Sequence, residues 1–214
     1  PAAFLRDPVR YLELAGRLGA TIIGGPNFSF EHCLRHATTP EALRRVDLSR
    51  LRFAFSGAET IRAETLRRFQ QVFAPCGFRP DMWVGCYGMA EATLAITVTP
   101  PGGGVAVLHL DAKALAEGRV APGEGVELAD SGVPAKGLEI AIVDPDAARR
   151  LPADRIGEIW VRGPAIASGY WRRAGDSAEI FGRVLDGRGG WMRTGDLGVM
   201  RDGRLFVTGR LKEL

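Results

Sequence analysis

Strand and helix signals alternate along the first hundred residues of this chain, and the alternation stops at one proline- and glycine-rich run. The expected helices span 8–18, 27–36 and 60–73, with Asp7 and Thr60 as their N-caps where a cap is visible, and the expected strands span 20–23, 51–55 and 82–84. Such alternation is typical of a layered α/β domain. The run Pro100-Pro101-Gly102-Gly103-Gly104 breaks it. Residues 1–100 are therefore predicted to form an α/β subdomain.

Strand signals dominate after this run. The candidates are residues 105–108, 138–143, 157–162 and 204–208. In the third of these, Ile159 and Val161 alternate with polar neighbours, which is the period of a strand with two different faces. Asp202-Gly203 is a hairpin turn signal. The sequence predicts a β-rich, barrel-like subdomain over 101–209, and 210–214 as the start of a hinge.

Composition excludes several classes of partner. The net charge is only +3 and the basic residues are scattered, so no nucleic-acid surface is expected. No apolar run is long enough to span a membrane, and no signal peptide is visible. Three cysteines without CxxC spacing indicate neither a disulfide framework nor a zinc site, which favours a reducing, cytoplasmic location.

The last twenty residues join an acid to a base through one short hairpin. Thr194-Gly195-Asp196 is predicted to be a turn, and Arg210 follows the hairpin strand. A carboxylate and a guanidinium held this way can grip a diol such as the hydroxyls of a ribose. Taken alone, Asp196 can equally cap its own backbone and Arg210 can be a surface charge.

Two glycine-containing turns could hold a flat ligand. Gly85-Cys86-Tyr87-Gly88-Met89-Ala90-Glu91 places an aromatic ring that can stack on a purine before an acid that can hold a divalent cation. Ser56-Gly57-Ala58-Glu59 follows a strand, and so small a turn lets a ligand rest against the backbone. For the first motif the alternative is that Tyr87 is simply buried and Glu91 is solvated. For the second it is a tight turn that binds no ligand. The histidines form no constellation with a Ser or Cys nucleophile.

The ordered set of motifs resembles the adenylate-forming superfamily, which includes acyl-CoA synthetases, luciferase and peptide-synthetase adenylation domains. The motifs are Ser56-Gly57-Ala58-Glu59, Tyr87-Gly88-Met89-Ala90-Glu91, Gly157-Glu158-Ile159-Trp160-Val161-Arg162-Gly163-Pro164 with Gly169-Tyr170-Trp171, Thr194-Gly195-Asp196-Leu197-Gly198 and Gly209-Arg210-Leu211-Lys212-Glu213. Each motif is modest, but their order over the whole chain is specific.

Within that superfamily the chain is most similar to the fatty acyl-AMP ligases. Gly24-Gly25-Pro26-Asn27-Phe28 followed by Cys33 resembles the segment beside the acyl tunnel, with Gly25, Asn27 and Phe28 as its acyl-pocket residues. The run from Phe69 to Pro80 resembles that branch's helix–loop link. Ala90 stands where most of the superfamily has Thr, which removes one hydroxyl contact to phosphate. Residues 105–131 resemble an insertion thought to restrain the C-terminal domain and to suppress thioester formation with CoA.

The resemblance implies a role for each matching position. Ser56, Gly57, Ala58 and Glu59 would form one wall of an adenine slot and Tyr87 the other, with Gly85, Cys86, Gly88 and Met89 beside the base. Glu91 would hold Mg²⁺, Asp196 and Arg210 would bind the ribose, and Lys212 would lie at the hinge. No residue of the chain is assigned as catalytic.

The implied activity is the activation of a fatty acid by ATP to an acyl-adenylate, followed by transfer to the phosphopantetheine thiol of an acyl carrier protein. Two alternatives stay open: a CoA-forming acyl ligase and a non-catalytic nucleotide-binding homologue. The family's phosphate loop and catalytic lysine are not found among these residues, so we expect the chain to be the central part of a longer enzyme. By itself it is expected to bind nucleotide weakly and not to adenylate.

Overall fold

The computed structural model describes residues 2–37 and 39–213. The helices are α1 (Ala2–Arg6), α2 (Val9–Arg17), α3 (Asn27–His36), α4 (Pro40–Arg44), α5 (Ala63–Phe73), α6 (Ala112–Ala116) and α7 (Ala174–Ile180), with 3-10 turns η1 (Ala74–Cys76), η2 (Pro80–Met82), η3 (Ala90–Ala92) and η4 (Leu211–Glu213). The strands are β1 (Ile22–Gly25), β2 (Phe53–Ser56), β3 (Trp83–Met89), β4 (Leu94–Val98), β5 (Val107–Leu110), β6 (Val126–Ala129), β7 (Val133–Pro134), β8 (Glu139–Asp144), β9 (Arg149–Arg150), β10 (Gly157–Arg162), β11 (Arg183–Leu185), β12 (Arg188–Arg201) and β13 (Arg204–Arg210).

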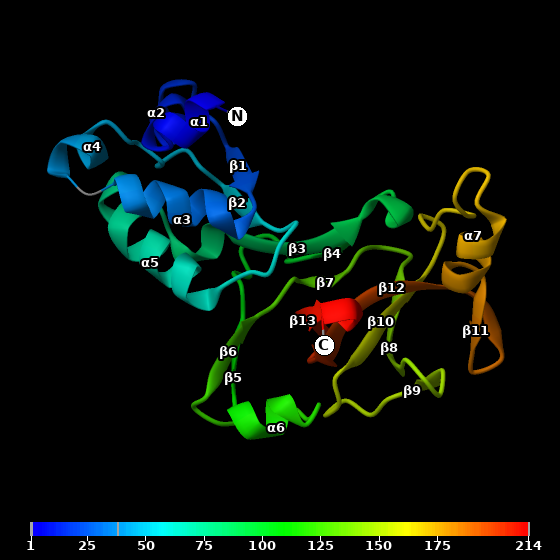
Figure 1. Cartoon of the computed structure of the whole chain (residues 1–214). Coiled ribbons are helices and arrows are strands. Elements are labelled where there is room, and N and C mark those ends of the chain that lie inside the picture. Colours follow the sequence, from blue (N-terminus) through cyan, green and yellow to red (C-terminus); the bar gives the residue numbers. More distant parts are fainter. Residues whose placement is uncertain (1, 38, 214) are drawn as a thin grey trace.

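The first sheet has the order β1-β2-β3-β4-β7, in which β1, β2 and β3 are parallel and the last two strands are antiparallel. Helices α1–α5 gather at one end of the molecule beside it (Figure 1), and α3 packs against α5. Their apolar faces and the strands share one core, in which Phe30, Phe69 and Trp83 meet edge to face. This core fixes the parallel strands whose carboxyl ends carry the residues of the site.

The second sheet has the order β11-β12-β10-β8-β9, and β13 pairs with β12. The 14-residue β12 is its longest strand. It pairs with β11 over 188–191, with β10 over 191–198 and with β13 over 196–201. This sheet curls into a half-barrel, and β5 and β6 form a separate two-stranded sheet with α6 in their connection (Figure 1). The predicted fold class, an α/β layer followed by a β-rich, barrel-like part, is confirmed.

Several elements match their predictions and others differ for physical reasons. Helix α3 and strand β10 have the predicted bounds. The predicted cap Thr60 is wrong, because α5 begins three residues later at Ala63. The N–H of Arg62, directly before the helix, donates to Asn27 Oδ1 (3.0 Å). The predicted turn around Tyr87 is also wrong: β3 continues through it to Met89.

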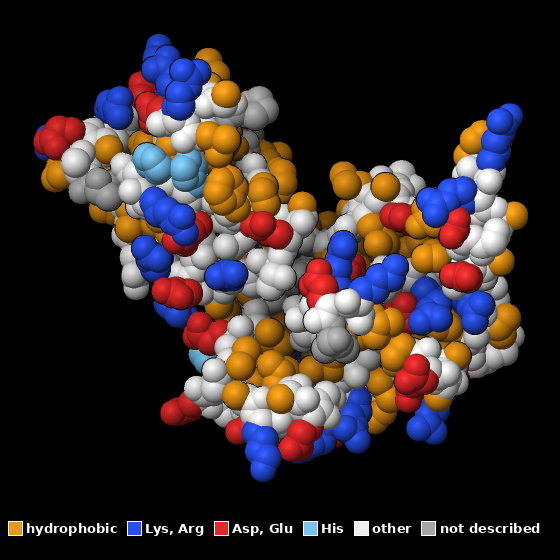
Figure 2. Space-filling model, in the orientation of Figure 1, with side chains coloured by type: hydrophobic (Ala, Val, Ile, Leu, Met, Phe, Trp, Pro, Cys, Tyr) orange, Lys and Arg blue, Asp and Glu red, His pale blue; other side chains and the backbone are white. Residues whose placement is uncertain are grey.

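The glycines explain the longer strands. A Cβ on Gly88 would lie 1.6 Å from the carbonyl oxygen of Leu94, so this glycine permits β3 to pair closely with β4. The sequence had predicted a turn at this position. Likewise β1 includes Gly24 and Gly25, which the sequence analysis placed after the strand. Figure 2 shows the surface hollowed between the end formed by α1–α5 and the end that carries α7.

Two further observations concern the predicted exclusions. Among the described residues, none of the helices combines the length and the apolar character that crossing a membrane requires. Cys33, Cys76 and Cys86 are all unpaired, and burial raises the pKa of the Cys33 thiol to about 12.

Candidate functional site

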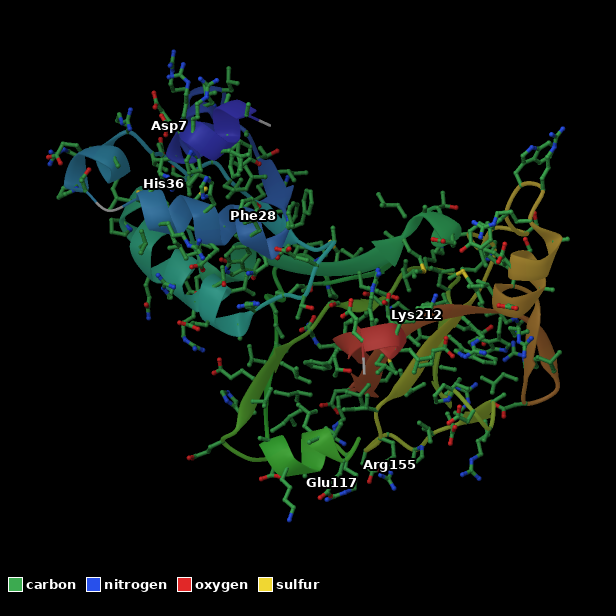
Figure 3. All side chains as sticks on the ribbon, in the orientation of Figure 1. Asp7, Phe28, His36, Glu117, Arg155 and Lys212 are labelled. Carbon is green, nitrogen blue, oxygen red and sulfur yellow. The ribbon has the colours of Figure 1, made fainter. Side chains whose placement is uncertain are left out.

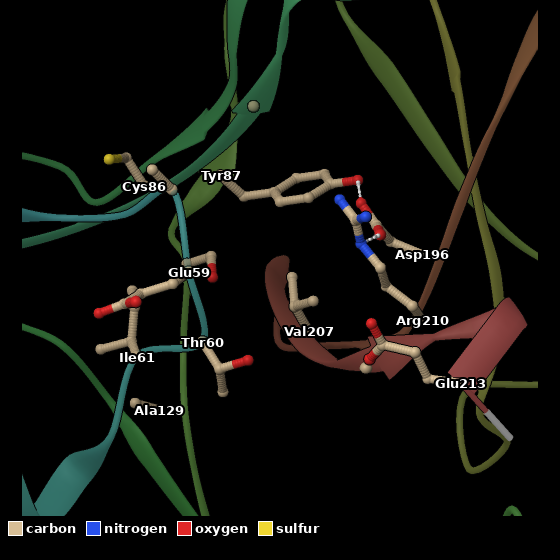
Figure 4. A pocket seen from close by; sticks show the side chains of 14 residues that line it. Glu59, Thr60, Ile61, Cys86, Tyr87, Ala129, Asp196, Val207, Arg210 and Glu213 are labelled. Carbon is tan, nitrogen blue, oxygen red and sulfur yellow. Dashed lines mark hydrogen bonds and ion pairs between the residues drawn. The ribbon is translucent and has the colours of Figure 1, made fainter. Parts of the chain in front are cut away.

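Tyr87, Asp196 and Arg210 line one cavity of about 330 Å³ (Figure 4). The cavity lies where the first sheet meets the hairpin of the second, so segments distant in the sequence supply its walls. The lining residues are Ala58, Glu59, Thr60, Ile61, Cys86, Tyr87, Gly88, Ala129, Ser131, Asp196, Val207, Gly209, Arg210 and Glu213. Polar groups therefore converge at one end of a space that is large enough for a small planar ligand.

The Tyr87 ring projects from β3 across the cavity toward β12 (Figure 4). Its hydroxyl donates a hydrogen bond to Asp196 Oδ2 at 2.7 Å. Burial of the phenol, reinforced by the charge of Asp196, raises the pKa of Tyr87 well above its usual range. The group is therefore a neutral donor at physiological pH, and the ring presents an aromatic face to the cavity.

Asp196 and Arg210 face each other across the β12–β13 ladder, in which they are register partners. Arg210 Nε lies 3.3 Å from Asp196 Oδ1, and the two side chains are 68% and 11% exposed. The prediction that one hairpin joins this acid to this base is confirmed, with Asp202-Gly203 at its turn. The exposed guanidinium of Arg210 thus lies beside the nearly buried carboxylate of Asp196.

The prediction that Asp196 sits in a turn is wrong, because β12 is continuous through it. The turn-like signal comes from a bulge: Gly195 has a φ of 72°, and the pairing of β12 with β10 shifts register here. Thr194 Oγ1 accepts the N–H of Asp196 (3.1 Å). The bulge aims the Asp196 carboxylate at the cavity.

Glu158 supports this bulge, and the sequence analysis missed its role. Its buried carboxylate accepts the N–H of Gly195 (3.1 Å) and the indole N–H of Trp160 (2.8 Å), and it pairs with Arg193 at 2.8 Å. The alternating pattern placed Glu158 on the polar face of the strand, whereas residues 157–161 are all buried, so the sequence carried no signal of this role. Ala129 and Ser131, which also line the cavity, carried no signal of their own.

Ala58 and Glu59 line the cavity, and Ser56 and Gly57 precede them behind its wall. A Cβ on Gly57 would lie 2.4 Å from Cys86 Sγ, so the backbone approaches β3 as closely as glycine allows. Ala58 has a left-handed φ of 65°. Ser56 is fully buried, and its hydroxyl has no partner among the described residues. The backbone of residues 56–58 is therefore packed closely against β3, and the side chains of Glu59, Thr60 and Ile61 follow it along the cavity.

Glu59 also binds back to α3. Its carboxylate accepts the N–H of Phe28, one of the free amides in the first turn of that helix. Asn27, the neighbouring residue, is buried and donates to Thr65 (3.2 Å) while accepting from Arg62. Reciprocal hydrogen bonds thus hold the 59–65 segment against the start of α3.

The predicted acyl-pocket residues are not all in one space. An apolar groove of about 600 Å³ runs along β1–β4 and includes Gly25. Phe28 lines a smaller hollow beside Gly25, and Asn27 faces a polar hollow with Glu31 and Arg62. The groove shares Ala58, Cys86, Tyr87 and Gly88 with the polar cavity, so the two spaces adjoin.

Glu91 does not line the cavity. It lies on η3, where its Oε1 accepts the hydroxyl of Tyr170 at 2.7 Å. This hydrogen bond, with a smaller contribution from burial, raises the pKa of Tyr170. Of the predicted nucleotide residues, Ser56, Gly57, Gly85 and Met89 are also outside the lining set. Across residues 2–37 and 39–213, no three His, Cys, Asp or Glu side chains gather as metal ligands.

Lys212, the predicted hinge residue, is exposed on η4 near the middle of the molecule (Figure 3). It follows Arg210 by two residues and precedes Glu213, which reaches the cavity. The last position of the predicted hinge segment, Leu214, lies outside the described residues.

Comparisons with known proteins identify the family of the chain. The profile of the family described as AMP-binding enzyme matches residues 1–171. The medium-chain-fatty-acid–[acyl-carrier-protein] ligase JamA of Moorena producens is 43% identical over 223 residues, covering 100% of this chain and 38% of the relative. A 4-hydroxyphenylalkanoate adenylyltransferase of Mycobacterium marinum is 39% identical over 229 residues, covering 100% of this chain and 36% of the relative.

A solved structure is similar along nearly the whole chain. It is a fatty acyl-adenylate ligase from L. pneumophila in complex with acyl adenylate and pyrophosphate, with a TM-score of 0.92 and 36% identity over 99% of this chain and 38% of that one. The chain thus spans well under half the length of the relatives it matches. Profile, sequence and fold agree that the chain belongs to the AMP-binding family of adenylate-forming enzymes.

Proposed function

We propose that the protein containing this chain joins a fatty carboxylate to the α-phosphate of ATP, which forms an acyl-adenylate and releases pyrophosphate. This chain supplies the nucleotide half of the site. The observation that carries the proposal is the meeting of Tyr87, Asp196 and Arg210 in a cavity that adjoins an apolar groove. An acyl-adenylate combines a flat base, a ribose diol and an apolar chain. The two adjoining spaces match its polar and apolar ends.

The adenine would lie between the Tyr87 ring and the backbone of residues 57–59. An aromatic face supports a base by stacking, and the glycine-limited approach of Gly57 to Cys86 leaves that wall flat. Backbone groups of Gly85, Cys86, Gly88 and Met89 would border the base edge. In this assignment Ser56 only shapes the wall from behind, since it is fully buried.

The ribose would bind at Asp196 and Arg210. The carboxylate is an acceptor for the two hydroxyl protons of the diol, and its contacts with Tyr87 and Arg210 already hold it in place. A clamp of this kind fixes the α-phosphate relative to the incoming carboxylate, and positioning is the main contribution that catalysis needs here.

Mg²⁺ would be held by Glu91 together with the phosphates of ATP. Mg²⁺ is commonly bound through one or two carboxylates, with substrate phosphates and water as its other ligands, so a single glutamate fits. The Tyr170 hydroxyl occupies one oxygen of Glu91 and orients the other. When bound, the ion would neutralise charge on the phosphates.

The acyl chain would occupy the apolar groove, whose lining includes Ile22, Phe53, Phe55 and Leu94. The name of the M. marinum relative makes an aryl-alkanoic acid the second candidate substrate. The acceptor we propose is the phosphopantetheine thiol of an acyl carrier protein, which the name JamA supports. Offering CoA and a holo-carrier protein together to the whole protein separates this acceptor from CoA.

The organisation proposed for the chain follows from the same assignment. Residues 1–100 would carry the adenine wall and the acyl segment, 101–209 the ribose-binding acid, and Lys212 the hinge to a further domain. The segment 105–131, which folds as β5-α6-β6, would be the insertion that restrains that domain.

The ribose clamp can be tested with the 214-residue chain. The probe is decanoyl-sulfamoyl adenosine, a stable acyl-adenylate analogue, and its 2′,3′-dideoxy form is the comparison ligand. Asp196→Asn keeps the shape but removes the charge, so we expect calorimetry to show about tenfold weaker binding of the probe. The dideoxy form should bind equally to both proteins.

The matched control is Asp186→Asn, which removes an exposed carboxylate from the β11–β12 hairpin. It should leave both affinities unchanged. Equal losses for the probe and its dideoxy form in Asp196→Asn would remove the ribose assignment. Absence of any binding by the unmodified chain would contradict the nucleotide assignment as a whole.

A further inference from the structure

We propose that Asp130 is a positioning residue of the nucleotide cavity: its buried carboxylate sets the spacing between the backbone segments that carry the cavity walls. The inference rests on the proposed nucleotide function but concerns a residue outside the lining set. Asp130 is 0% exposed and lies between β6 and β7, where the three sheets of the molecule meet.

Four donors from four different places converge on this carboxylate. Oδ1 accepts the N–H of Gly132 (2.6 Å), and Oδ2 accepts the N–H of Ala106 (2.6 Å) and Nη1 of Arg204 (2.8 Å). The Thr99 hydroxyl lies 3.3 Å from Oδ1 and shares its one proton between Oδ1 and the carbonyl oxygen of Gly85. A carboxylate is an acceptor only, with room for about four such bonds. Its capacity is therefore filled by groups that belong to separate strands and loops.

One arm of this network reaches the adenine wall. The Thr99 hydroxyl accepts the N–H of Gly85 at 3.0 Å and lies 3.1 Å from the carbonyl oxygen of the same residue. A Cβ on Gly85 would lie 2.4 Å from the Asp130 carbonyl oxygen, so β3 rests directly on this segment. Cys86 and Tyr87, the next residues of β3, line the cavity.

The other arm reaches the ribose side. Arg204 begins β13, and the same strand carries Val207, Gly209 and Arg210 into the cavity. Backbone hydrogen bonds reinforce the attachment: the N–H of Ser131 donates to Leu205 (2.7 Å), and the N–H of Leu205 donates to Gly132 (2.9 Å). The strands that carry the two walls, β3 and β13, are thus both bonded to the segment around Asp130.

Asp130 is also flanked by cavity residues, since Ala129 and Ser131 both line the space. A buried charge is costly unless every bond to it is made, and apolar residues of similar volume would stabilise such a position as well or better. What a carboxylate adds is direction, because its bonds specify where each donor must lie. This is the property required of a group that sets the width of a slot.

The test changes the two arms in turn, because loss of Asp130 itself can prevent folding. Thr99→Val removes the hydroxyl and keeps the volume, whereas Thr99→Ser removes only the methyl group. Arg204→Gln removes the charge on β13 that pairs with Asp130. The control Arg188→Gln removes an exposed pairing with Glu139 in the second sheet, outside the cavity. Thr99 also lines the apolar groove, so the probe here is sulfamoyl adenosine without an acyl chain. Its binding is measured where each variant remains fully folded, beside the melting temperature.

Thr99→Val and Arg204→Gln are expected to weaken binding by on the order of tenfold, the size typical of coupling through a packed network. Thr99→Ser and Arg188→Gln should stay within about twofold of the unmodified chain. If the first two variants lower only the melting temperature and keep their affinity, Asp130 is a stabilising charge and the inference is overturned. Equal losses in Thr99→Ser would overturn it too.

Failure of the proposed function gives a different pattern. If the unmodified chain binds no probe, the nucleotide assignment fails, and the role of Asp130 is then read from amide hydrogen exchange. Arg204→Gln must speed exchange in both 83–89 and 204–210, while Arg188→Gln must not. Faster exchange confined to 204–210 would overturn the positioning role.

Discussion

Asp196 has two side-chain partners, and these contacts decide what each neighbour contributes. Tyr87 donates to one carboxylate oxygen and Arg210 contacts the other. The phenol therefore has two separable parts: a ring that can support a base and a hydroxyl that satisfies a nearly buried charge. Substitutions at this one position can separate them.

Tyr87→Phe is expected to lower the free energy of unfolding by about 1–2 kcal/mol, since a hydrogen bond to a charged group is lost. The ring remains, so affinity for decanoyl-sulfamoyl adenosine should change by less than about threefold. Tyr87→Ala should weaken binding by about tenfold or more, because stacking on an aromatic ring contributes about 1–3 kcal/mol per base. Urea unfolding and calorimetry give the two quantities. Equal affinities for the two variants would show that the ring does not face the base.

Cys33 gives the fold a predicted weakness at alkaline pH. Burial raises the pKa of its thiol from 9.0 to about 12, so the folded state retains a proton that the unfolded state loses. The resulting stability is fully present below pH 9 and is lost as pH rises from 9 toward 12. Between pH 8 and pH 10 the loss from this group should be about 1.4 kcal/mol.

Cys33→Ala removes this titration while leaving the other groups in place. Urea unfolding of both proteins at pH 8 and pH 10 should therefore show the smaller drop in the variant, whatever the cost of the substitution at pH 8. The same drop in both proteins would mean that the folded thiol ionises as readily as the unfolded one.

At the scale of the element, the bulge in β12 is the device that aims Asp196. Gly195 adopts a φ of 72°, and a Cβ there would meet nothing within 4 Å. Gly187, in the β11–β12 turn, has the same φ of 72° and the same open space. The two glycines form a matched pair that differs in distance from the site and not in local strain.

Gly195→Ala and Gly187→Ala should each destabilise the fold by about 1 kcal/mol, the usual penalty for Ala at positive φ. Only Gly195→Ala is expected to weaken the acyl-adenylate analogue, because relaxing the bulge turns the Asp196 carboxylate away. Thermal unfolding and calorimetry on both variants provide the check. A comparable loss of affinity in Gly187→Ala would point to general loosening of the sheet.

The same glycines explain where prediction from the sequence succeeded and failed. Strand β10 was predicted with its observed bounds, because apolar residues alternate along it without interruption. β12 was missed, and the predicted turn at Thr194-Gly195-Asp196 lies inside it, because Gly195 was interpreted as a turn residue. A glycine marks freedom of the backbone, and whether a chain uses that freedom for a turn or for close pairing depends on neighbours distant in the sequence.

The site divides in a similar way. The acid and base of the β12–β13 hairpin were predictable because both lie on one local element. The positions of Glu59 against α3 and Glu91 against Tyr170 were not, because their partners are 31 and 79 residues away. The family motifs assign no role to Glu158 or Asp130. Their support of the site is visible only in their tertiary hydrogen bonds.

For the whole molecule, the cavity is a junction between two separately packed parts. One core packs β1, β2 and β3 against α2–α5, and another joins β4 to β8, β10 and β12. The cavity draws its lining from both sides. A ligand seated there contacts both parts at once. Binding energy is therefore expected to restrain their relative motion as well as to stabilise each part.

Amide hydrogen exchange with and without decanoyl-sulfamoyl adenosine tests this expectation. Saturating ligand at about 100 times its Kd should add about 2.7 kcal/mol to the free energy of unfolding. Protection should rise in β3 (83–89) and in β13 (204–210) together, since each carries a wall of the cavity. The β8–β9 hairpin, remote from the lining set, is the internal control and should change little. Protection restricted to β3 would mean that the base binds without the ribose clamp, and protection restricted to β13 would place the ligand outside the slot.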